Sequence, residues 1–191
     1  MFPVAISGPR LALRELTEAD ADPLHALLSD ARVAERVIDE APPSLAQVRE
    51  IIPAWREAAA GAERQVYKLA AVEDGRLVGM GTLAVTAAQH RRGEIGYVIH
   101  PDRWGHGLAT ELAALLVELG FGAVGLHRVE ATTRPDHAAS YRVMEKIGMR
   151  REGRFRDHLL VRGAWWDSVS YAILATDRSA PRRVAGVADA S

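Results

Sequence analysis

The sequence predicts an α/β fold in which helices pack on a central mixed β-sheet. Segments with strand-like and helix-like patterns alternate along most of the chain. A short apolar strand, a glycine-containing loop and an amphipathic helix follow one another over residues 93–112. Asp74-Gly75 and Arg162-Gly163 each join two strand-like runs, as the turns of hairpins do. Together these observations predict a twisted sheet with both parallel and antiparallel neighbours.

The first third of the chain predicts one strand and two helices. Residues 10–16 alternate apolar and polar side chains, which is typical of a strand with one buried face. Thr17 or Asp22 then caps a helix. Residues 32–43 form a weakly patterned connector, and a second helix, capped by its own serine, runs over residues 44–60.

The middle of the chain predicts three strands. Residues 67–72 and 76–85 form the first hairpin, and residues 89–93 form a polar turn. Residues 94–100 are rich in β-branched and aromatic side chains, and Pro101 ends this strand.

The last third predicts a helix, a strand, a helix and a hairpin. From residue 108 leucines recur three or four apart and share one face. A strand follows at 127–132, and a helix at 136–147 directs Ala139, Val143, Met144 and Ile147 inward. Residues 150–161 and 165–174 pair as the final hairpin.

Length and composition fit one globular domain. The chain has 191 residues, of which 48% are hydrophobic and 26% charged. We expect a single domain over residues 1–175 and a disordered tail over residues 176–191, where Arg, Ala, Gly and Pro dominate.

Charge and residue usage favour a cytoplasmic protein that binds neither nucleic acid nor a membrane. The formal net charge of -1 gives no basic field for nucleic acid, so anion recognition has to be local. Cysteine is absent, which excludes disulfides and thiolate metal sites, and the seven histidines show no metal-ligand spacing. We expect no metal, no signal peptide and no membrane span.

The loop between the strand at 94–100 and the helix from residue 108 predicts a phosphate cradle. Gly105 and Gly107 let several backbone N–H groups point into one concavity, and the following helix adds its unpaired N–H groups. A dinucleotide fingerprint needs a third glycine where this chain has Thr110, and a Gly-Lys-Ser/Thr triphosphate loop is absent. The cradle therefore suits a pyrophosphate of another kind.

These residues resemble a known family motif. Trp-Gly-x-Gly-x-Ala-Thr-Glu reads here from Trp104 to Glu111, after Glu-Ile-Gly-Tyr and a proline, and residues 10–22 form a second similar stretch. The chain resembles, over residues 9–174, the RimJ/RimL type of the GNAT superfamily of acyl-CoA-dependent N-acyltransferases. The resemblance implies the GNAT fold, a central twisted mixed sheet flanked by helices, and acetyl-CoA as co-substrate.

The resemblance also implies which residues bind the donor. The pyrophosphate would lie on the backbone of Trp104 to Thr110, with Arg103 supplying charge where many relatives have Gln or Arg at position 104. The pantetheine arm would follow the strand edge at Tyr97, Val98 and Ile99. The expected donor-binding residues are Tyr97, Val98, Ile99, Arg103, Trp104, Gly105, His106, Gly107, Leu108, Ala109, Thr110 and His137.

A second segment, residues 134–149, resembles the family pattern Asn-x-x-Ser-x-x-x-x-x-Lys-x-Gly-Phe. His137 stands where the family has Asn, and an imidazole can still donate a hydrogen bond to the pantetheine. Ser140 matches the position near the thioester sulfur, where its hydroxyl would donate a hydrogen bond to the thiolate. The tyrosine that other branches place four residues later is Met144 here, so that route offers no tyrosine acid.

Glu94 is the candidate base, acting directly or through water on an amine that attacks the thioester through a tetrahedral intermediate. An α-amino group of pKa roughly 7.8 is about a third neutral near pH 7.5, so a weak base suits a peptide N-terminus. The acceptor stays open between a protein N-terminal α-amine and a small-molecule amine, and the donor between acetyl-CoA and a longer acyl-CoA such as succinyl-CoA. A non-catalytic acyl-CoA-binding module is the alternative, and the resemblance implies a homodimer through the last strands.

Overall fold

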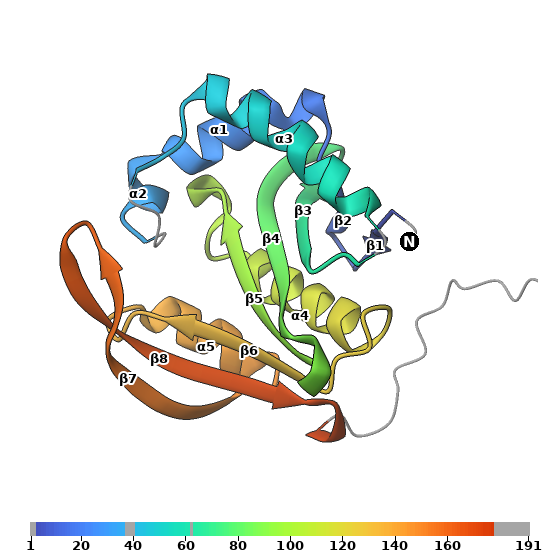
Figure 1. Ribbon diagram of the computed structural model, residues 1–191. Helices are drawn as coiled ribbons and strands as arrows, with labels where there is room; N and C mark the ends of the chain where they lie inside the picture. The colour runs from blue at the N-terminus through green and yellow to red at the C-terminus, as the bar shows by residue number, and fades with distance from the viewer. Residues whose placement is uncertain (1–2, 37–40, 62, 178–191) are drawn as a thin grey trace, which may run out of the picture.

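The computed structural model describes residues 3–36, 41–61 and 63–177, and these form one sheet with helices on both faces (Figure 1). The strand order is β1-β2-β3-β4-β5-β6-β8-β7. Neighbours pair antiparallel except β5 and β6, which are parallel. The predicted mixed α/β sheet is confirmed.

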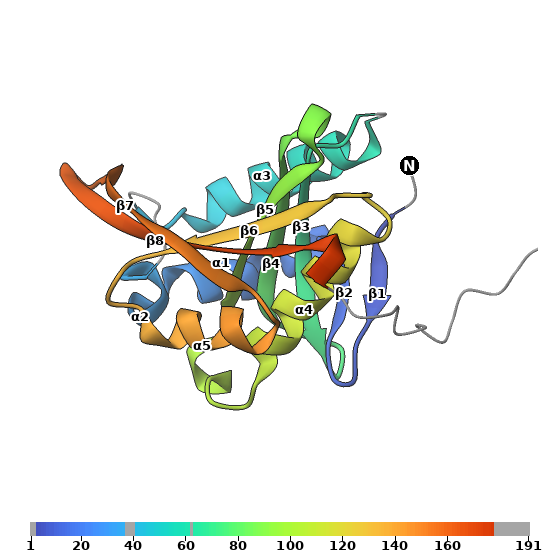
Figure 2. The same ribbon diagram turned by 90° about the horizontal axis from the view of Figure 1, so that it is seen from below.

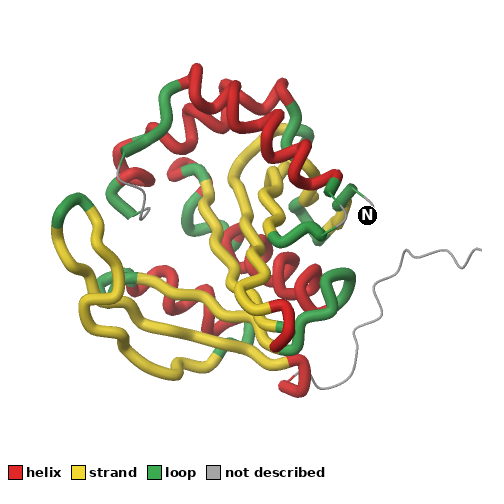
Figure 3. Tube along the Cα trace, in the orientation of Figure 1, coloured by secondary structure: helices red, strands yellow, loops and turns green. Residues whose placement is uncertain are grey.

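The elements follow the predicted order closely (Figure 3). The strands are β1 (Ala5–Ser7), β2 (Ala12–Glu15), β3 (Val66–Glu73), β4 (Arg76–Ala87), β5 (Arg92–Ile99), β6 (Arg128–Thr133), β7 (Arg150–Val161) and β8 (Ala164–Leu174). The α-helices are α1 (Ala21–Ser29), α2 (Ala31–Ala34), α3 (Leu45–Ala60), α4 (Leu108–Phe121) and α5 (Ala138–Lys146). Short 3-10 helices are η1 (Glu18–Asp20), η2 (Ala88–His90), η3 (Pro101–Arg103) and η4 (Ala175–Asp177).

Helices cover both faces of the sheet (Figure 2), and a separate hydrophobic cluster lies under the helices of each face. Helices α1 and α3 cover one face through Leu24, Leu27 and Ile52, all fully buried. Helix α4 covers the other face, where the leucine stripe predicted from residue 108 is buried against β3 to β6 and where α5 packs beside it. Its members are Leu108, Leu112, Leu115, Leu116 and Leu119.

Local sequence signals explain several boundaries. The side chain of Ser44 accepts a hydrogen bond from the N–H of Gln47 and so caps α3 where predicted. Asp74 and Gly75 adopt φ angles of 49° and 77°, the left-handed pair that a tight hairpin between β3 and β4 needs. A Cβ at Gly81 would lie 2.9 Å from Leu112 Cδ1, so glycine lets α4 approach β4 closely.

Strands β5 and β6 pair over only part of their length. The parallel pairing joins Arg92–Glu94 to Arg128–Glu130, whereas β5 continues to Ile99 and β6 to Thr133. Figure 1 shows the two strands diverging beyond this point. The sheet therefore has an opening at its centre, next to the loop that precedes α4.

The structure corrects four local expectations. Strand β1 and helix α2 were not predicted, because three and four residues are too few to show a period. The polar turn predicted over 89–93 ends early, since Arg92 and Gly93 already belong to β5. Ala139, in the first turn of α5, is exposed instead of inward.

The C-terminal boundary differs by two residues from the prediction. Thr176 and Asp177, placed by the sequence in the tail, belong to the 3-10 helix η4. An Asp177 carboxylate oxygen accepts the N–H of Leu174 and so ends β8. Residues 178–191, the rest of the predicted tail, lie outside the described residues.

Candidate functional site

A cleft of about 360 Å³ lies where β5 and β6 separate. Its walls come from β5, the loop before α4, the first turn of α4, one side of α5 and the segment around α2. All of the predicted site residues except Glu94 and His106 line it, namely Tyr97, Val98, Ile99, Arg103, Trp104, Gly105, Gly107, Leu108, Ala109, Thr110, His137 and Ser140. The fold thus brings together two sequence segments about thirty residues apart.

The glycine loop leaves backbone N–H groups without partners among the described residues, as the predicted cradle would require. Gly105 and Gly107 adopt φ angles of 80° and 79°, which favour glycine, and α4 begins directly after them. Within the described part of the chain, no group accepts a hydrogen bond from the N–H groups of residues 105–109. Unpaired N–H groups at a helix N-terminus attract an anion.

An ion pair braces the cradle from behind. Glu111 Oε1 accepts the N–H groups of Arg10 (2.7 Å) and Leu11 (2.8 Å), and Glu111 Oε2 accepts Arg10 Nε at 3.1 Å. The same guanidinium donates from Nη1 to the carbonyl of His106 at 2.7 Å. The His106 ring bonds to the carbonyl of Trp104 at 2.8 Å, so this side chain holds the loop and does not line the cleft.

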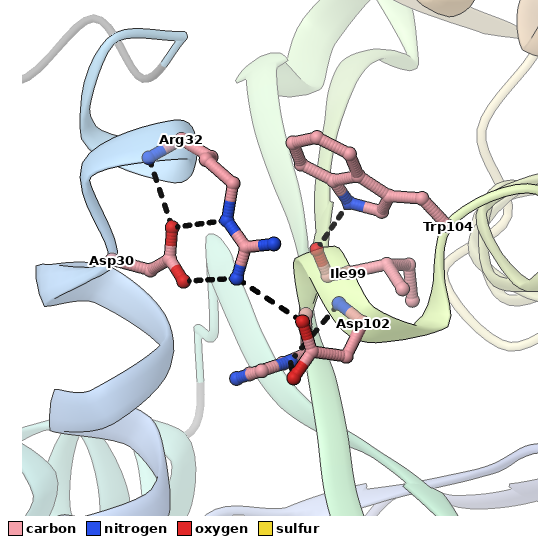
Figure 4. A network of polar contacts seen from close by, with 6 residues as sticks. Asp30, Arg32, Ile99, Asp102 and Trp104 are labelled. Atoms are coloured by element: carbon pink, nitrogen blue, oxygen red, sulfur yellow. Dashed lines mark hydrogen bonds and ion pairs between the residues drawn. The ribbon is translucent and has the colours of Figure 1, made fainter.

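The Trp104 side chain lines the cleft, and its ring nitrogen points to Ile99 at the end of β5 (Figure 4). Its Nε1 donates to the carbonyl of Ile99 at 2.7 Å, and the Arg36 guanidinium lies 5.2 Å from the ring centroid. Arg32, in α2, bonds Asp30 and Asp102 and so ties α2 to η3. The hydrogen bond from Arg32 lowers the pKa of Asp30 to about 2, so this carboxylate stays ionised.

Four cationic side chains line the cleft, and only one of them, Arg103, forms an ion pair among the described residues. The described lining contains Arg36, Arg103, Arg142 and Lys146 and no acidic side chain, although Arg103 forms an ion pair with Glu73 outside the lining. Arg103 Nε is buried and has no partner among the described residues. This excess of positive charge fits a ligand with several phosphates.

Sequence reasoning missed three of these cations, namely Arg36, Arg142 and Lys146. Arg142 and Lys146 lie one helical turn apart on α5, and both line the cleft with Ser140. Lys146 also stands at the Lys position of the second family pattern. The spacing of four residues between Arg142 and Lys146, just after Ser140, could therefore have indicated that both line the site.

Two hydroxyl groups meet in the cleft. The Tyr97 hydroxyl lies 3.0 Å from Ser140 Oγ, so Ser140 is not an isolated surface serine. Burial raises the pKa of Tyr97 to about 12, which keeps the phenol protonated near neutral pH. Met144, four residues after Ser140, is fully buried in the core.

His137 is a neutral side chain at the start of α5. Its Nδ1 lies 3.3 Å from the Thr133 hydroxyl. Burial lowers the pKa of His137 below its usual 6.5, and the positive charge of Arg36 lowers it further. A neutral imidazole can donate one hydrogen bond, which is the role expected of His137 at the position where the family pattern has Asn.

Glu94 lies on the other face of the sheet from the Tyr97 side chain. Side chains alternate along a strand, so Glu94, Gly96 and Val98 face α1 and α3. Glu94 Oε1 accepts the hydroxyl proton of Thr132 at 2.7 Å. Gly96 is exposed, and a Cβ there would have only Thr82 Cβ within 4 Å. Open space therefore borders the carboxylate on this face.

Metal binding and membrane crossing each need a recognisable structural feature. Across the described ranges, no three His, Cys, Asp or Glu side chains gather as a metal site would require. None of the helices in the described part of the chain combines the length and the apolar character that crossing a bilayer demands.

Comparisons with known proteins point to one family. The profile of the family described as "Acetyltransferase (GNAT) domain" matches residues 10–150. The uncharacterized N-acetyltransferase YoaA of Bacillus subtilis is 33% identical over 91% of this chain and 98% of its own length. YnaD of the same organism, also an uncharacterized N-acetyltransferase, is 32% identical over 88% of this chain and 96% of its own length.

A solved structure extends this similarity to the RimJ/RimL type. The structure of Mycobacterium smegmatis RimJ in complex with CoA-disulfide has a TM-score of 0.82 and 27% identity, covering 93% of this chain and 91% of the other. The resemblance read from residues 93–112 is thereby confirmed.

Proposed function

Because this chain belongs to the GNAT family of N-acetyltransferases, we propose that it transfers the acetyl group of acetyl-CoA to a primary amine. A peptide N-terminal α-amine is the favoured acceptor. The observation that carries the proposal is the convergence, at one opening in the sheet, of an anion cradle, a cationic wall and a pair of hydroxyl groups.

The donor site fits the chemistry of acetyl-CoA. The unpaired N–H groups of residues 105–109 would hold the pyrophosphate, and Arg142 and Lys146 would bind further phosphate oxygens. The edge of β5 that faces β6 has no β6 partner beyond Glu94, and its backbone groups other than the Ile99 carbonyl would be open to the amide-containing pantetheine arm. His137 would donate a hydrogen bond to the same arm.

The acceptor would approach from the opposite face of the sheet. Glu94 lies there beside the exposed Gly96, and Thr132 fixes one carboxylate oxygen and leaves the other to accept a proton. An α-amine of pKa roughly 7.8 is already partly neutral, so one carboxylate, acting directly or through water, supplies enough base. When bound, acetyl-CoA supplies the thioester, and Ser140 would donate a hydrogen bond to its sulfur as the amine attacks.

The first test is free CoA release from acetyl-CoA with a panel of N-terminal peptides and small amines. We expect peptide α-amines to stimulate release, and Gly107→Trp to abolish both release and CoA binding by filling the cradle. Glu94→Gln should lower turnover at least tenfold with CoA affinity within twofold. Gly75→Trp, in the β3–β4 turn with nothing within 4 Å, is the matched control.

The panel separates the alternatives. If only small amines stimulate release, the acceptor is a small-molecule amine and not a peptide. If the reaction is faster with succinyl-CoA, the donor is succinyl-CoA and not acetyl-CoA. RimJ, as a structure with bound CoA-disulfide, supports a CoA site, but tight CoA binding without release for any acceptor would indicate a non-catalytic binding module.

A further inference from the structure

Two hydroxyl groups from different layers of the fold meet at the centre of the cleft. Tyr97 comes from β5 and Ser140 from α5, and their oxygens lie 3.0 Å apart. Both side chains line the cleft, and both border the opening between β5 and β6. Either oxygen could donate on distance alone, so the direction has to come from chemistry.

The acidity and the other contacts of the Tyr97 hydroxyl indicate which of the two groups donates the hydrogen bond. A hydroxyl carries one proton and two acceptor lone pairs. The Tyr97 phenol is partly buried between β5 and α5, and burial raises its pKa to about 12, so it keeps its proton. Its hydroxyl has Ser140 Oγ at 3.0 Å, and the carbonyl of Ser140 at a marginal 3.5 Å. A phenolic O–H is a stronger donor than an aliphatic one, and its other acceptor is marginal, so we take Tyr97 as the donor to Ser140 Oγ.

This bond determines what the serine proton does. A serine near the start of a helix ordinarily turns its hydroxyl back to a carbonyl of the preceding turn. A phenol that donates to Oγ occupies one lone pair and holds Oγ at the cleft, so the serine proton is available to a ligand. We propose that Tyr97 is a positioning residue that acts through Ser140, directing the serine proton to the sulfur of the bound thioester. The inference rests on the proposed function.

The reaction balances without proton transfer from either hydroxyl. The amine nitrogen bonds to the carbonyl carbon, the carbon–sulfur bond breaks, and its electron pair remains on sulfur. The surplus amine proton goes to Glu94, directly or through water. A thiolate whose thiol has a pKa of roughly 8.5 is a weaker base, by about a thousandfold or more, than the anion of a phenol of pKa about 12, so it does not take the Tyr97 proton. The hydroxyl pair thus stabilises the thiolate by hydrogen bonding, and the thiolate is later protonated by solvent.

The first measurement titrates the thiol of CoA bound to the protein, followed by the ultraviolet absorbance of the thiolate. It needs neither an acceptor nor turnover. We expect the wild-type complex to hold the thiol pKa below roughly 8.5, and Tyr97→Phe and Ser140→Ala each to raise it by about half a unit or more. In the double variant the rise should equal that of Ser140→Ala alone, because Tyr97 acts only through the serine.

A second tyrosine provides the matched control. Tyr171, on β8, donates to Glu145 at 3.2 Å and does not line the cleft. Tyr171→Phe also removes one phenolic hydroxyl from the same hydrophobic layer, and should leave the thiol pKa of bound CoA unchanged. Equal shifts in the Tyr97 and Tyr171 variants would overturn the proposal.

The turnover measurement adds a kinetic signature. With an active acceptor, Tyr97→Phe should lower kcat about fivefold while KM for acetyl-CoA stays within twofold, and should have no further effect in a Ser140→Ala background. A loss of the same size with and without the serine hydroxyl would refute action through Ser140. Absence of CoA binding by the wild type would overturn the proposed function itself, whereas normal binding with an unchanged thiol pKa in Tyr97→Phe would overturn only this inference.

Discussion

Replacing Glu111 tests whether one carboxylate holds the cradle in place. In Glu111→Ala the buried N–H of Leu11 loses its acceptor, which costs about 1–3 kcal/mol. The N–H of Arg10, which is more exposed, adds about 1 kcal/mol. The ion pair with Arg10, whose side chain is 43% exposed, adds only about 0.5 kcal/mol. The expected loss in the free energy of unfolding is therefore about 3 kcal/mol.

Urea and thermal denaturation measure this loss. For a chain of this size, about 3 kcal/mol lowers Tm by roughly 6–12 °C. Glu111→Gln keeps an oxygen for both backbone N–H groups but turns an amide toward the guanidinium, so it should cost only about 1 kcal/mol. The control Arg49→Ala removes an ion pair with Asp22 in which both side chains are mostly exposed, and should change stability by less than about 0.5 kcal/mol.

Arg10→Ala distinguishes support of the glycine loop from a contribution to the stability of the whole fold. It leaves both backbone bonds to Glu111 but removes the bond from the guanidinium to the His106 carbonyl. CoA affinity, measured by calorimetry, should fall about fivefold while Tm changes by only a few degrees. A cost below about 1 kcal/mol in Glu111→Ala, or equal destabilisation of the Gln and Ala variants, would contradict this role of Glu111.

Three further predictions use other parts of the molecule. In Gly96→Val the valine side chain enters the open space beside Glu94. This variant should raise KM for the acceptor at least tenfold in steady-state assays and leave CoA affinity within twofold. Weaker CoA binding would contradict this prediction. Arg142→Ala with Lys146→Ala should weaken CoA binding more than tenfold at low salt and flatten its salt dependence, and an unchanged salt dependence would exclude phosphate contacts. Burial raises the pKa of Asp20, but hydrogen bonds from Arg14 and Thr17 outweigh it, so the net pKa lies below 3.8. The stability that these bonds contribute is present above the unfolded pKa and is lost as pH falls through the folded pKa. Asp20→Asn should therefore flatten the loss of stability toward urea at acid pH.

Much of the fold was predictable because its signals are local. The cap at Ser44, the Asp74-Gly75 turn and the leucine stripe of α4 each depend on residues a few positions apart, and all are found where predicted. Strand β1 and helix α2 depend on their neighbours instead. Arg32, for example, ties α2 to Asp102, seventy residues away, and no periodicity shows such a contact.

The candidate site also combines features that local sequence determines with features that depend on distant contacts. The cradle was predictable since Gly105 and Gly107 act through their own backbone. The meeting of Tyr97 with Ser140 was not, because it depends on how α5 crosses the strand edge. The sequence also predicted Glu94 beside the cradle, whereas the alternation along β5 places its side chain on the far face.

The incomplete pairing of β5 and β6 has a kinetic consequence for the proposed reaction. The cradle lies at the start of α4 on one side of the sheet, and Glu94 with Gly96 lies on the other. In the proposed reaction each substrate would enter and leave by its own side, so both would occupy the enzyme in one ternary complex. Free CoA should compete with acetyl-CoA alone, and no concentration of acceptor should relieve its inhibition.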